Sequence, residues 1–243
     1  GDDLELTVND HGTSFRLWSP KAQEAIVNLY DNGHTGKPYS TLPMKFDPAT
    51  GTWSASLPEK LYGKFYTFRV KNDGNWLPET PGVWAKAVGV NGKRAAIIDF
   101  AGTDPEGWEN DRGPEMKNFT DAVIYEMHHR DMSMDPSSGI ANKGKFLALT
   151  EEGTVSPLGE KTGIDHLKEL GVTHIHILPS YDYNSVDEAN LHENQYNWGY
   201  DPQNYNTPEG SYSTNPSDPA TRVREMKEMI KALHDAGIGV IMD

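Results

Sequence analysis

The sequence predicts a multidomain protein with an antiparallel β-sandwich at the N-terminus and an α/β segment after it. Up to about residue 100, short runs alternate between apolar and polar residues and are separated by turn residues, which is typical of half-buried antiparallel strands. From residue 121, near-continuous apolar runs alternate with amphipathic helical segments, which is typical of parallel strands joined by helices. A length of 243 residues allows one or two domains.

Five runs carry the predicted strands of the sandwich: TSFRLWS, EAIVNLYD, GTWSASLP, KFYTFRVK and RAAIIDF. They are rich in aromatic and β-branched residues, and turn signals separate them at short spacing. Residues 101–118 lose this alternation and concentrate charge, glycine and proline, so they form a predicted linker. We therefore expect a sandwich domain at residues 1–115 and a second domain at 116–243.

The second domain begins with a buried strand and continues with two units of helix, glycine and strand. The apolar run at 121–128 is the first strand. In the first unit, Thr162 can cap a helix that Gly171 ends, before a strand at 172–178. Helices that alternate with strands imply right-handed βαβ units and a parallel sheet, either open or closed into a barrel.

The second unit follows the same order. Asp218 and Pro219 fit an N-cap and a first helical position, and Gly237 stops the helix before a strand at 238–243. About three parallel strands do not close a barrel, so we expect the front part of a larger domain. The apolar face of this helix is predicted to hold Val223, Met226, Met229, Ile230 and Leu233.

Residues 196–216 combine five aromatic side chains with three prolines and two glycines. No regular period crosses them, so a loop is predicted. It follows the strand at 172–178, on the carboxyl side where α/β folds place their ligand sites. Its rings either cover the protein's own core or offer flat faces to a sugar, and the position of the loop favours the sugar.

Composition excludes several classes of function. The 36 acidic and 22 basic side chains give a net charge of −14, which repels nucleic acids and anionic membranes. The absence of cysteine excludes thiolate nucleophiles and cysteine-bound metals. No apolar run reaches 18 residues, so we expect a soluble protein without membrane contact, secreted or in the cell envelope if a leader was removed and otherwise cytoplasmic.

The aromatic segment YNWGYDPQNYNTPEGSYSTNP resembles, almost residue for residue, the signature of type I pullulanases in the α-amylase superfamily, glycoside hydrolase family 13. Three further segments, VIYEMHHRD, TGIDHLKELGVTHIHILP and GIGVIMD, are similar to the beginning of the family's barrel. The N-terminal FRLWSPKAQEAIVNLY is similar to carbohydrate-binding module 48. The resemblance covers essentially the whole chain. It implies a sandwich followed by the first three strands of a TIM-type (β/α)8 barrel, incomplete in this chain.

By this resemblance, Tyr200 stacks beneath the sugar whose bond is cleaved, with a buried loop anchor as the alternative. Trp198 and Tyr196 either widen the sugar platform or pack the loop onto the barrel. Asp243 is implied to support the catalytic groups from behind. Asp201 precedes Pro202 and is either a catalytic carboxylate or a turn residue that supports the site. We predict the supporting role, because Asp-Pro commonly starts a turn. In the family the nucleophilic Asp and the acid/base Glu lie on later strands, so no catalytic residue is assigned within this chain.

No metal site or cofactor is predicted. His174 and His176 lie two residues apart on a strand and point to one face, but no third ligand accompanies them. His128 and His129 are neighbours, and we expect them to pack on opposite faces of a strand with hydrogen-bond partners. Three acidic residues could hold calcium although their spacing matches no EF-hand: Asp182, Asp187 and Glu188.

Four tryptophans of the sandwich are candidate sugar platforms. Trp18 and Trp53 alternate with apolar neighbours and are predicted to lie in the core. Trp76 and Trp84 lie in connections rich in glycine and proline and are predicted to be exposed. Whether the sandwich binds glucan stays open, because this kind of module also serves as a contact for the barrel.

For the parent protein, the resemblance implies hydrolysis of α-1,6 linkages in pullulan or branched starch oligosaccharides, with retention through a covalent glycosyl-enzyme. The chain alone is expected to be inactive, with the remaining barrel strands supplied by a continuation or by a second polypeptide. The alternatives are a related isoamylase or branching enzyme, and a non-catalytic α-glucan-binding protein.

Overall fold

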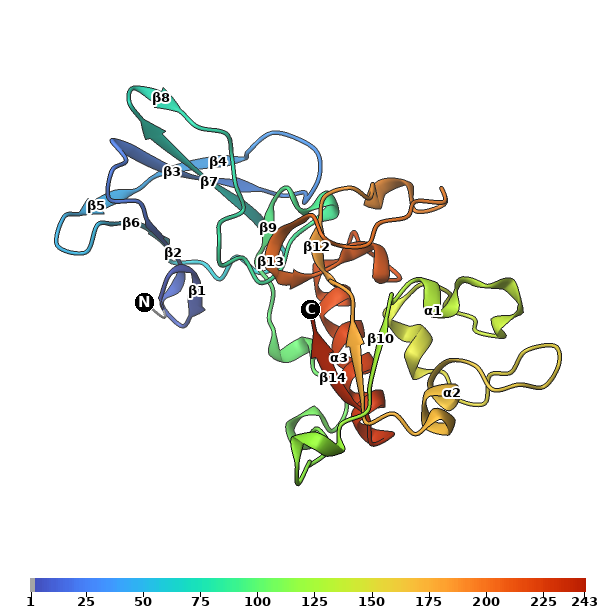
Figure 1. Cartoon of the computed structure of the whole chain (residues 1–243). Coiled ribbons are helices and arrows are strands. Elements are labelled where there is room, and N and C mark those ends of the chain that lie inside the picture. The colour runs from blue at the N-terminus through green and yellow to red at the C-terminus, as the bar shows by residue number, and fades with distance from the viewer. Residues whose placement is uncertain (1–2) are drawn as a thin grey trace. The chain divides into compact units, whose positions relative to one another are not determined.

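The computed structural model describes residues 3–243, and they form two compact units. The first unit contains the residues up to Asp99 together with Gln203–Thr207. The second contains Phe100–Pro202 and Pro208–Asp243. Antiparallel sheets build the first unit, and a small parallel sheet with helices builds the second (Figure 1).

Two antiparallel sheets form the first unit. One has the strand order β1-β2-β6-β5, and the other has the order β4-β3-β7-β8 with β9 beside β7. A shared core of buried side chains from both sheets includes Phe15, Leu29 and Phe68. The strands are β1 (Glu5–Asn9), β2 (Gly12–Trp18), β3 (Glu24–Tyr30), β4 (Ser40–Pro43), β5 (Lys45–Asp47), β6 (Thr52–Leu57), β7 (Phe65–Asn72), β8 (Asn75–Trp76) and β9 (Ala95–Ala96).

The first pair of sandwich tryptophans divides between the two faces of its sheet. Trp53 is 7% exposed and pairs with Leu17 on the core face. Trp18 is 62% exposed, so its predicted core position is wrong. Successive residues of a strand face opposite sides, and Trp18 shares the outer face with Ser14 and Arg16 while Phe15 points inward.

The second pair of sandwich tryptophans differs in exposure. Trp84 is exposed, as predicted. Trp76 is half-buried rather than exposed, because the guanidinium of Arg69 on the paired strand lies over its ring at 5.6 Å.

The segment Gln203–Thr207 belongs to β13 (Pro202–Pro208), so a strand interrupts the region predicted to be a loop throughout. Its amide side chains hold this extended segment in the first unit. The Nδ2 atom of Asn204 donates to the Gly92 carbonyl at 3.0 Å, and the Nε2 atom of Gln203 donates to the Asn91 carbonyl at 3.0 Å. These long-range bonds, which no sequence period reports, explain the error.

A three-stranded parallel sheet organises the second unit, in the order β10-β11-β14. In the register, Glu126 lies opposite His176, which lies opposite Ile241. On the other face of the sheet, Ile175 and Ile177 are fully buried. The strands are β10 (Ile124–Met127), β11 (His174–Ile177) and β14 (Gly239–Met242), and β12 (Tyr181–Tyr183) follows β11.

Two long helices precede the second and third strands as predicted. In α2 (Gly163–Leu170), Thr162 is the N-cap residue, but its hydroxyl donates to the Ser138 carbonyl instead of capping the helix. In α3 (Pro219–Asp235), the Asp218 carboxylate does cap, because it accepts from the Ala220 amide at 3.1 Å. The shorter helical segments are α1 (Asp131–Met134), η1 (Val90–Gly92), η2 (Ala101–Thr103), η3 (Trp108–Asn110), η4 (Phe119–Asp121), η5 (Pro136–Ser138), η6 (Phe146–Thr150), η7 (Glu188–Asn190) and η8 (Gly210–Tyr212).

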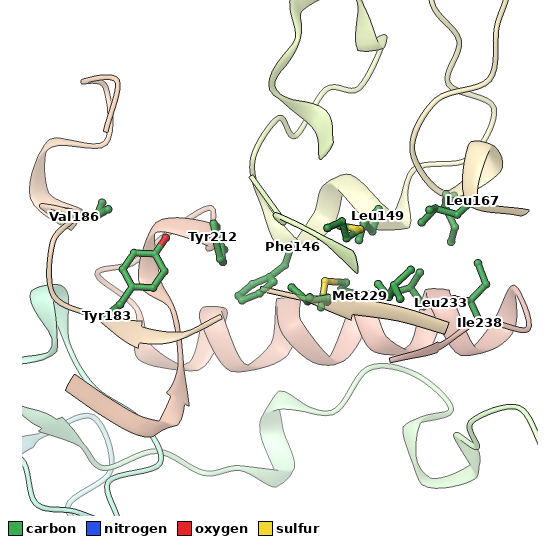
Figure 2. Packing of buried hydrophobic residues seen from close by; sticks show 13 residues of the cluster. Phe146, Leu149, Leu167, Tyr183, Val186, Tyr212, Met229, Leu233 and Ile238 are labelled. Carbon is green, nitrogen blue, oxygen red and sulfur yellow. The ribbon is translucent and has the colours of Figure 1, made fainter. Parts of the chain in front are cut away.

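The core of the second unit lies between the sheet and the helices. Met229 and Leu233 of α3 meet Leu167 of α2 and residues of η6 in this core (Figure 2). Tyr183 and Tyr212 extend it beneath the long segment that follows β11. The apolar face predicted for the last helix is therefore confirmed as its packing face.

Residues 101–118, predicted to be a linker, pack against α3 instead. The ammonium of Lys227 donates to Thr103 Oγ1 at 2.8 Å and to Asp104 Oδ1 at 2.5 Å. His234 Nδ1 lies 2.8 Å from Asp111 Oδ2. These polar contacts come from residues that flank the apolar face of the helix, since Lys227 follows Val223 and His234 follows Ile230 by four residues. Within residues 3–243, no helix has the length and apolar character needed to span a bilayer.

Candidate functional site

The candidate site lies at the carboxyl end of β14, where Asp243 meets Tyr200. The Tyr200 hydroxyl donates a hydrogen bond of 2.6 Å to Asp243 Oδ2. This bond to a negative acceptor raises the pKa of the Tyr200 phenol. The Asp243 amide donates to the Ile177 carbonyl at 3.3 Å, so backbone pairing with β11 holds the carboxylate in place.

Gly199 brings the chain into the position that Tyr200 needs. Its φ is +92°, a conformation that residues with a side chain rarely adopt. A Cβ at this position would lie 2.3 Å from the Pro179 carbonyl oxygen, just beyond β11. Only glycine lets the aromatic segment approach the strand end so closely.

His128, at the end of β10, holds the same segment from another side. Its Nδ1 atom accepts from the Asp131 amide at 3.3 Å, which leaves Nε2 to donate to the Asn197 carbonyl at 2.7 Å. Its ring lies 5.1 Å from the ring of Tyr196. We predicted packing with hydrogen-bond partners for His128, but not its contact with the aromatic segment.

His129 turns into the core between the rings of Phe146 and Tyr212, at centroid distances of 5.3 and 4.8 Å. Burial disfavours the charged imidazolium and lowers the pKa of His129 to about 4. Because its pKa is that low, the His129 ring stays neutral at physiological pH and packs among the core side chains.

The three rings proposed as a sugar platform all face outward. Tyr196, Trp198 and Tyr200 are 50%, 61% and 56% exposed. A ring that only anchored the loop would be covered, so the exposure favours the platform over the loop anchor. Flat aromatic faces beside a carboxylate suit the apolar C–H faces and the hydroxyls of a sugar.

Asp201 shapes the turn that carries these rings. Its carboxylate accepts from Asn197 Nδ2 at 2.8 Å and from the Ser185 hydroxyl. The Asn197 side-chain oxygen in turn accepts from the Gly199 amide at 2.8 Å. Aspartate side chains in turns commonly form such local hydrogen bonds.

A buried cluster of charge lies behind the same segment. Asp182, Glu188, Glu209 and Arg222 are each at most 4% exposed. The three carboxylates offer oxygens that all lie within 4.8 Å of one another. Arg222 Nη2 is 2.9 Å from Glu188 Oε2, and Nη1 is 3.3 Å from Asp182 Oδ1. We call these four residues the charge cluster.

The environment of Glu209 differs from that of its neighbours. Burial, together with the negative charges of Glu188 and Asp182, raises the pKa of Glu209 well above its ordinary value. The backbone amides of Tyr183 and Ser211 donate to its two oxygens at 2.8 and 3.0 Å. Through these two bonds, Glu209 connects β12 with η8.

The acidic residues weighed as a calcium site do not all meet. Asp187 lies apart from the charge cluster and caps η7, where its Oδ1 accepts from the Ala189 amide at 3.0 Å. Glu209, which the sequence reading left out, takes its place beside Asp182 and Glu188. The guanidinium of Arg222 already supplies positive charge there.

A cavity of about 520 Å³ opens beside the charge cluster in the second unit. Acidic residues lie near two of its basic residues. Arg130 Nη1 lies 3.3 Å from Asp131 Oδ1, and the negative charges of Glu225 and Glu209 favour the charged form of Lys145. Burial nevertheless lowers the pKa of Lys145. The lining residues are Arg130, Met134, Lys143, Gly144, Lys145, Tyr183, Val186, Leu191, His192, Glu193, Asn194, Gln195, Ser211 and Tyr212.

Comparison with known proteins relates both units of this chain to other proteins. Residues 3–88 match the model of carbohydrate-binding module 48, the isoamylase N-terminal domain. A pullulanase of Bacillus subtilis (strain 168) is 40% identical over 234 residues, which cover 96% of this chain. The crystal structure of a Paenibacillus barengoltzii pullulanase in complex with maltohexaose and α-cyclodextrin is 56% identical and superposes with a TM-score of 0.97 over 100% of this chain.

This chain matches the N-terminal portion of bacterial type I pullulanases. It spans 31% of the length of the Bacillus subtilis pullulanase and 38% of the Paenibacillus barengoltzii chain. Isoamylase 3 of Oryza sativa subsp. japonica is 34% identical over 148 residues, which cover only 58% of this chain. The pullulanase match thus extends over the aromatic segment and both units, whereas the isoamylase match is partial.

Proposed function

We propose that the protein containing this chain is a debranching glycoside hydrolase that cleaves α-1,6-glucosidic linkages. The observation that carries the proposal is the hydrogen bond between the exposed Tyr200 and the Asp243 carboxylate at a strand end. In this role, the Tyr200 ring stacks beneath the sugar at the cleaved bond and Asp243 fixes its hydroxyl. Trp198 and Tyr196 extend the platform, and Asp201 supports the turn.

We further propose that β10, β11 and β14 are the first three strands of a (β/α)8 barrel. Parallel sheets normally have both faces covered. Here one face packs on α2 and α3, whereas Ile124 and Glu126 on the other face are exposed. The exposed face fits the interior of a barrel completed by further strands, as a continuation of the chain or as a second polypeptide.

The chemistry of the proposed reaction needs two carboxyl groups. Retaining glycosidases place a nucleophile and an acid/base roughly 5 Å apart across the scissile bond. We assign neither role to a residue of this chain. In this proposal the chain supplies the sugar platform and the supporting carboxylate Asp243, and later strands supply the reacting pair.

The proposed substrate is a neutral α-glucan, such as pullulan or a branched starch oligosaccharide. Two observations support it: the net charge of −14 disfavours anionic polymers, and a related pullulanase was crystallised with maltohexaose and α-cyclodextrin. The first unit, as a carbohydrate-binding module 48, could add a second glucan contact through exposed rings such as Trp84.

Product analysis with the full-length protein tests the proposal. Cleavage of the α-1,6 links in pullulan should release maltotriose, with the new reducing end first formed in the α configuration. A relative of the isoamylases or branching enzymes would act on amylopectin and leave pullulan intact. Binding of maltooligosaccharides without any release of reducing ends would identify a non-catalytic glucan-binding protein instead.

A further inference from the structure

The charge cluster joins the two halves of the segment that carries the aromatic platform. Asp182 and Glu188 precede the rings in the sequence, and Glu209 follows them. Asp182 and Glu188 pair with Arg222 of α3, and Glu209 offers an oxygen within 4.8 Å of oxygens of both carboxylates. Each of the four side chains is at most 4% exposed. The two ends of the segment that carries the platform are therefore held at one buried point of the second unit.

The guanidinium makes several contacts at that point. Its Nη1 atom donates to the Pro208 carbonyl at 3.3 Å, and its Nη2 atom donates to the Pro216 carbonyl at 3.2 Å. Nη2 also donates to Glu188 Oε2 at 2.9 Å. A planar fork can address several acceptors at once, which a lysine ammonium on a flexible stem does less well. Close packing adds rigidity, since a Cβ on Gly210 would lie 2.2 Å from Glu188 Oε1 and 2.6 Å from Arg222 Nη2.

The same helix also sets the position of Asp243. The α3 helix ends at Asp235, turns at Gly237 with a φ of +76°, and leads directly into β14. Asp243 is the next residue after this strand. Arg222 thus connects the segment bearing Tyr200 with the helix and strand that present the hydrogen-bond partner of Tyr200.

We propose that Arg222 is a positioning residue for the reaction: through Asp182 and Glu188 it sets the Tyr200 ring relative to the Asp243 carboxylate. The inference rests on the proposed function, because it concerns how the sugar platform is held. Arg222 is fully buried and does not touch substrate. A displacement of about 1 Å in a positioned group can lower turnover about a hundredfold.

The first test replaces the planar guanidinium of Arg222 by a lysine ammonium in the full-length enzyme. Arg222→Lys should lower kcat on pullulan by roughly ten- to a hundredfold while KM changes much less. Arg224→Lys, two residues along the same helix and outside the charge cluster, is the matched control and should leave kcat unchanged. Circular dichroism and a thermal scan establish that both variants are folded at the assay temperature.

A double-mutant cycle separates positioning from general stability. Tyr200→Phe removes the hydroxyl that donates to Asp243 while keeping the ring. If Arg222 acts through that bond, Arg222→Lys should lower kcat only a fewfold in the Tyr200→Phe background. Should Arg222→Lys not fold, Gly210→Ala disturbs the same contacts without removing a charge and enters the same cycle.

The inference is wrong if a folded Arg222→Lys enzyme keeps the parent kcat, or if its loss is equally large with and without the Tyr200 hydroxyl. Failure of the proposed function would look different. In that case the parent enzyme itself would release no maltotriose from pullulan, so there would be no kcat for the Arg222 variants to lower.

Discussion

The charge cluster and the aromatic platform belong to one stretch of chain between β11 and α3, yet they reverse the usual distribution of side chains. Asp182, Glu188, Glu209 and Arg222 are buried, while Tyr196, Trp198 and Tyr200 are exposed. Apolar rings normally supply the stabilising burial of a loop, and charges normally stay in water. Here the buried charges hold both ends of the segment, and the rings stay exposed.

The difference implies that stability and function can be altered separately within one segment. Breaking a buried ion pair leaves an uncompensated charge in the interior, which is strongly destabilising. Removing an exposed ring leaves no cavity and no orphaned charge. We therefore expect substitutions in the charge cluster to lower the unfolding free energy strongly. Substitutions in the aromatic platform should lower turnover while changing the unfolding free energy little.

The largest effect is expected from Arg222→Met. Loss of the guanidinium leaves Asp182 and Glu188 buried without their cation, so the second unit should lose about 3–5 kcal/mol of unfolding free energy. Denaturant unfolding of the full-length protein measures this, with Arg224→Met as the control on the same helix. A loss below about 1 kcal/mol would mean that the charge cluster does not hold the segment.

Tyr200→Ala tests the other region. We expect turnover on pullulan to fall well over tenfold, because a positioned sugar contact acts on the transition state, while unfolding stays cooperative. The Tyr200 ring is more than half exposed, so its removal should cost little stability. Steady-state kinetics decides the matter, and unchanged kcat and KM would remove Tyr200 from the site.

Glu5 in the first unit sharpens the comparison, because its buried carboxylate is held by a backbone donor rather than by an arginine. It accepts from the Trp84 amide at 2.7 Å, and burial raises its pKa from 4.5 to about 7. The unfolded chain releases this proton near pH 4.5 and the folded chain near pH 7. Its contribution to stability is therefore present below pH 4.5 and is lost as the pH rises to 7, by an amount on the order of 1–2 kcal/mol after allowance for solvent screening.

Glu5→Gln should remove this pH dependence from the unfolding of the first unit. The measurement is the difference in unfolding free energy between parent and variant at pH 4.5 and at pH 7.5. A difference that does not change with pH would show that the Glu5 carboxylate titrates as it does in water.

The smallest effect is expected from Trp198→Ala. The ring is exposed and adjoins the platform, so KM should rise a fewfold while the unfolding free energy changes by less than about 0.5 kcal/mol. A marked loss of stability would instead support the alternative in which this ring packs the loop onto the barrel. Calorimetry and kinetics on the same preparation separate the two outcomes.

The period of apolar residues in the sequence was sufficient to predict the main helices and parallel strands, but it could not predict polar contacts between distant residues. The strands β10, β11 and β14 and the helices α2 and α3 lie where apolar spacing and capping residues predict them. The strand β13 was missed because side-chain amides bond to carbonyls more than 100 residues away in the sequence. Trp18 was misplaced although strict alternation with Phe15 would have put it outside.

The candidate site was predictable only in part. The aromatic segment and its place after β11 follow from composition and order, and the role proposed for Tyr200 rests on the family resemblance. The charge cluster was missed because its members are up to 40 residues apart. The spacing of Arg222 could have predicted the charge cluster. Arg222 lies on the same helix face as Met226, Met229 and Leu233. A buried charge on that face needs an oppositely charged partner.

Gly199 limits how this site can be altered by engineering. Its positive φ and the nearby Pro179 carbonyl leave no room for a side chain, so a library that randomises positions 196–200 together will return mostly misfolded members unless position 199 is kept as glycine. Trp198, one residue earlier, has an exposed side chain and is free to vary. If the proposed function holds, efforts to change which branched oligosaccharides are accepted should therefore diversify position 198 and keep position 199 fixed.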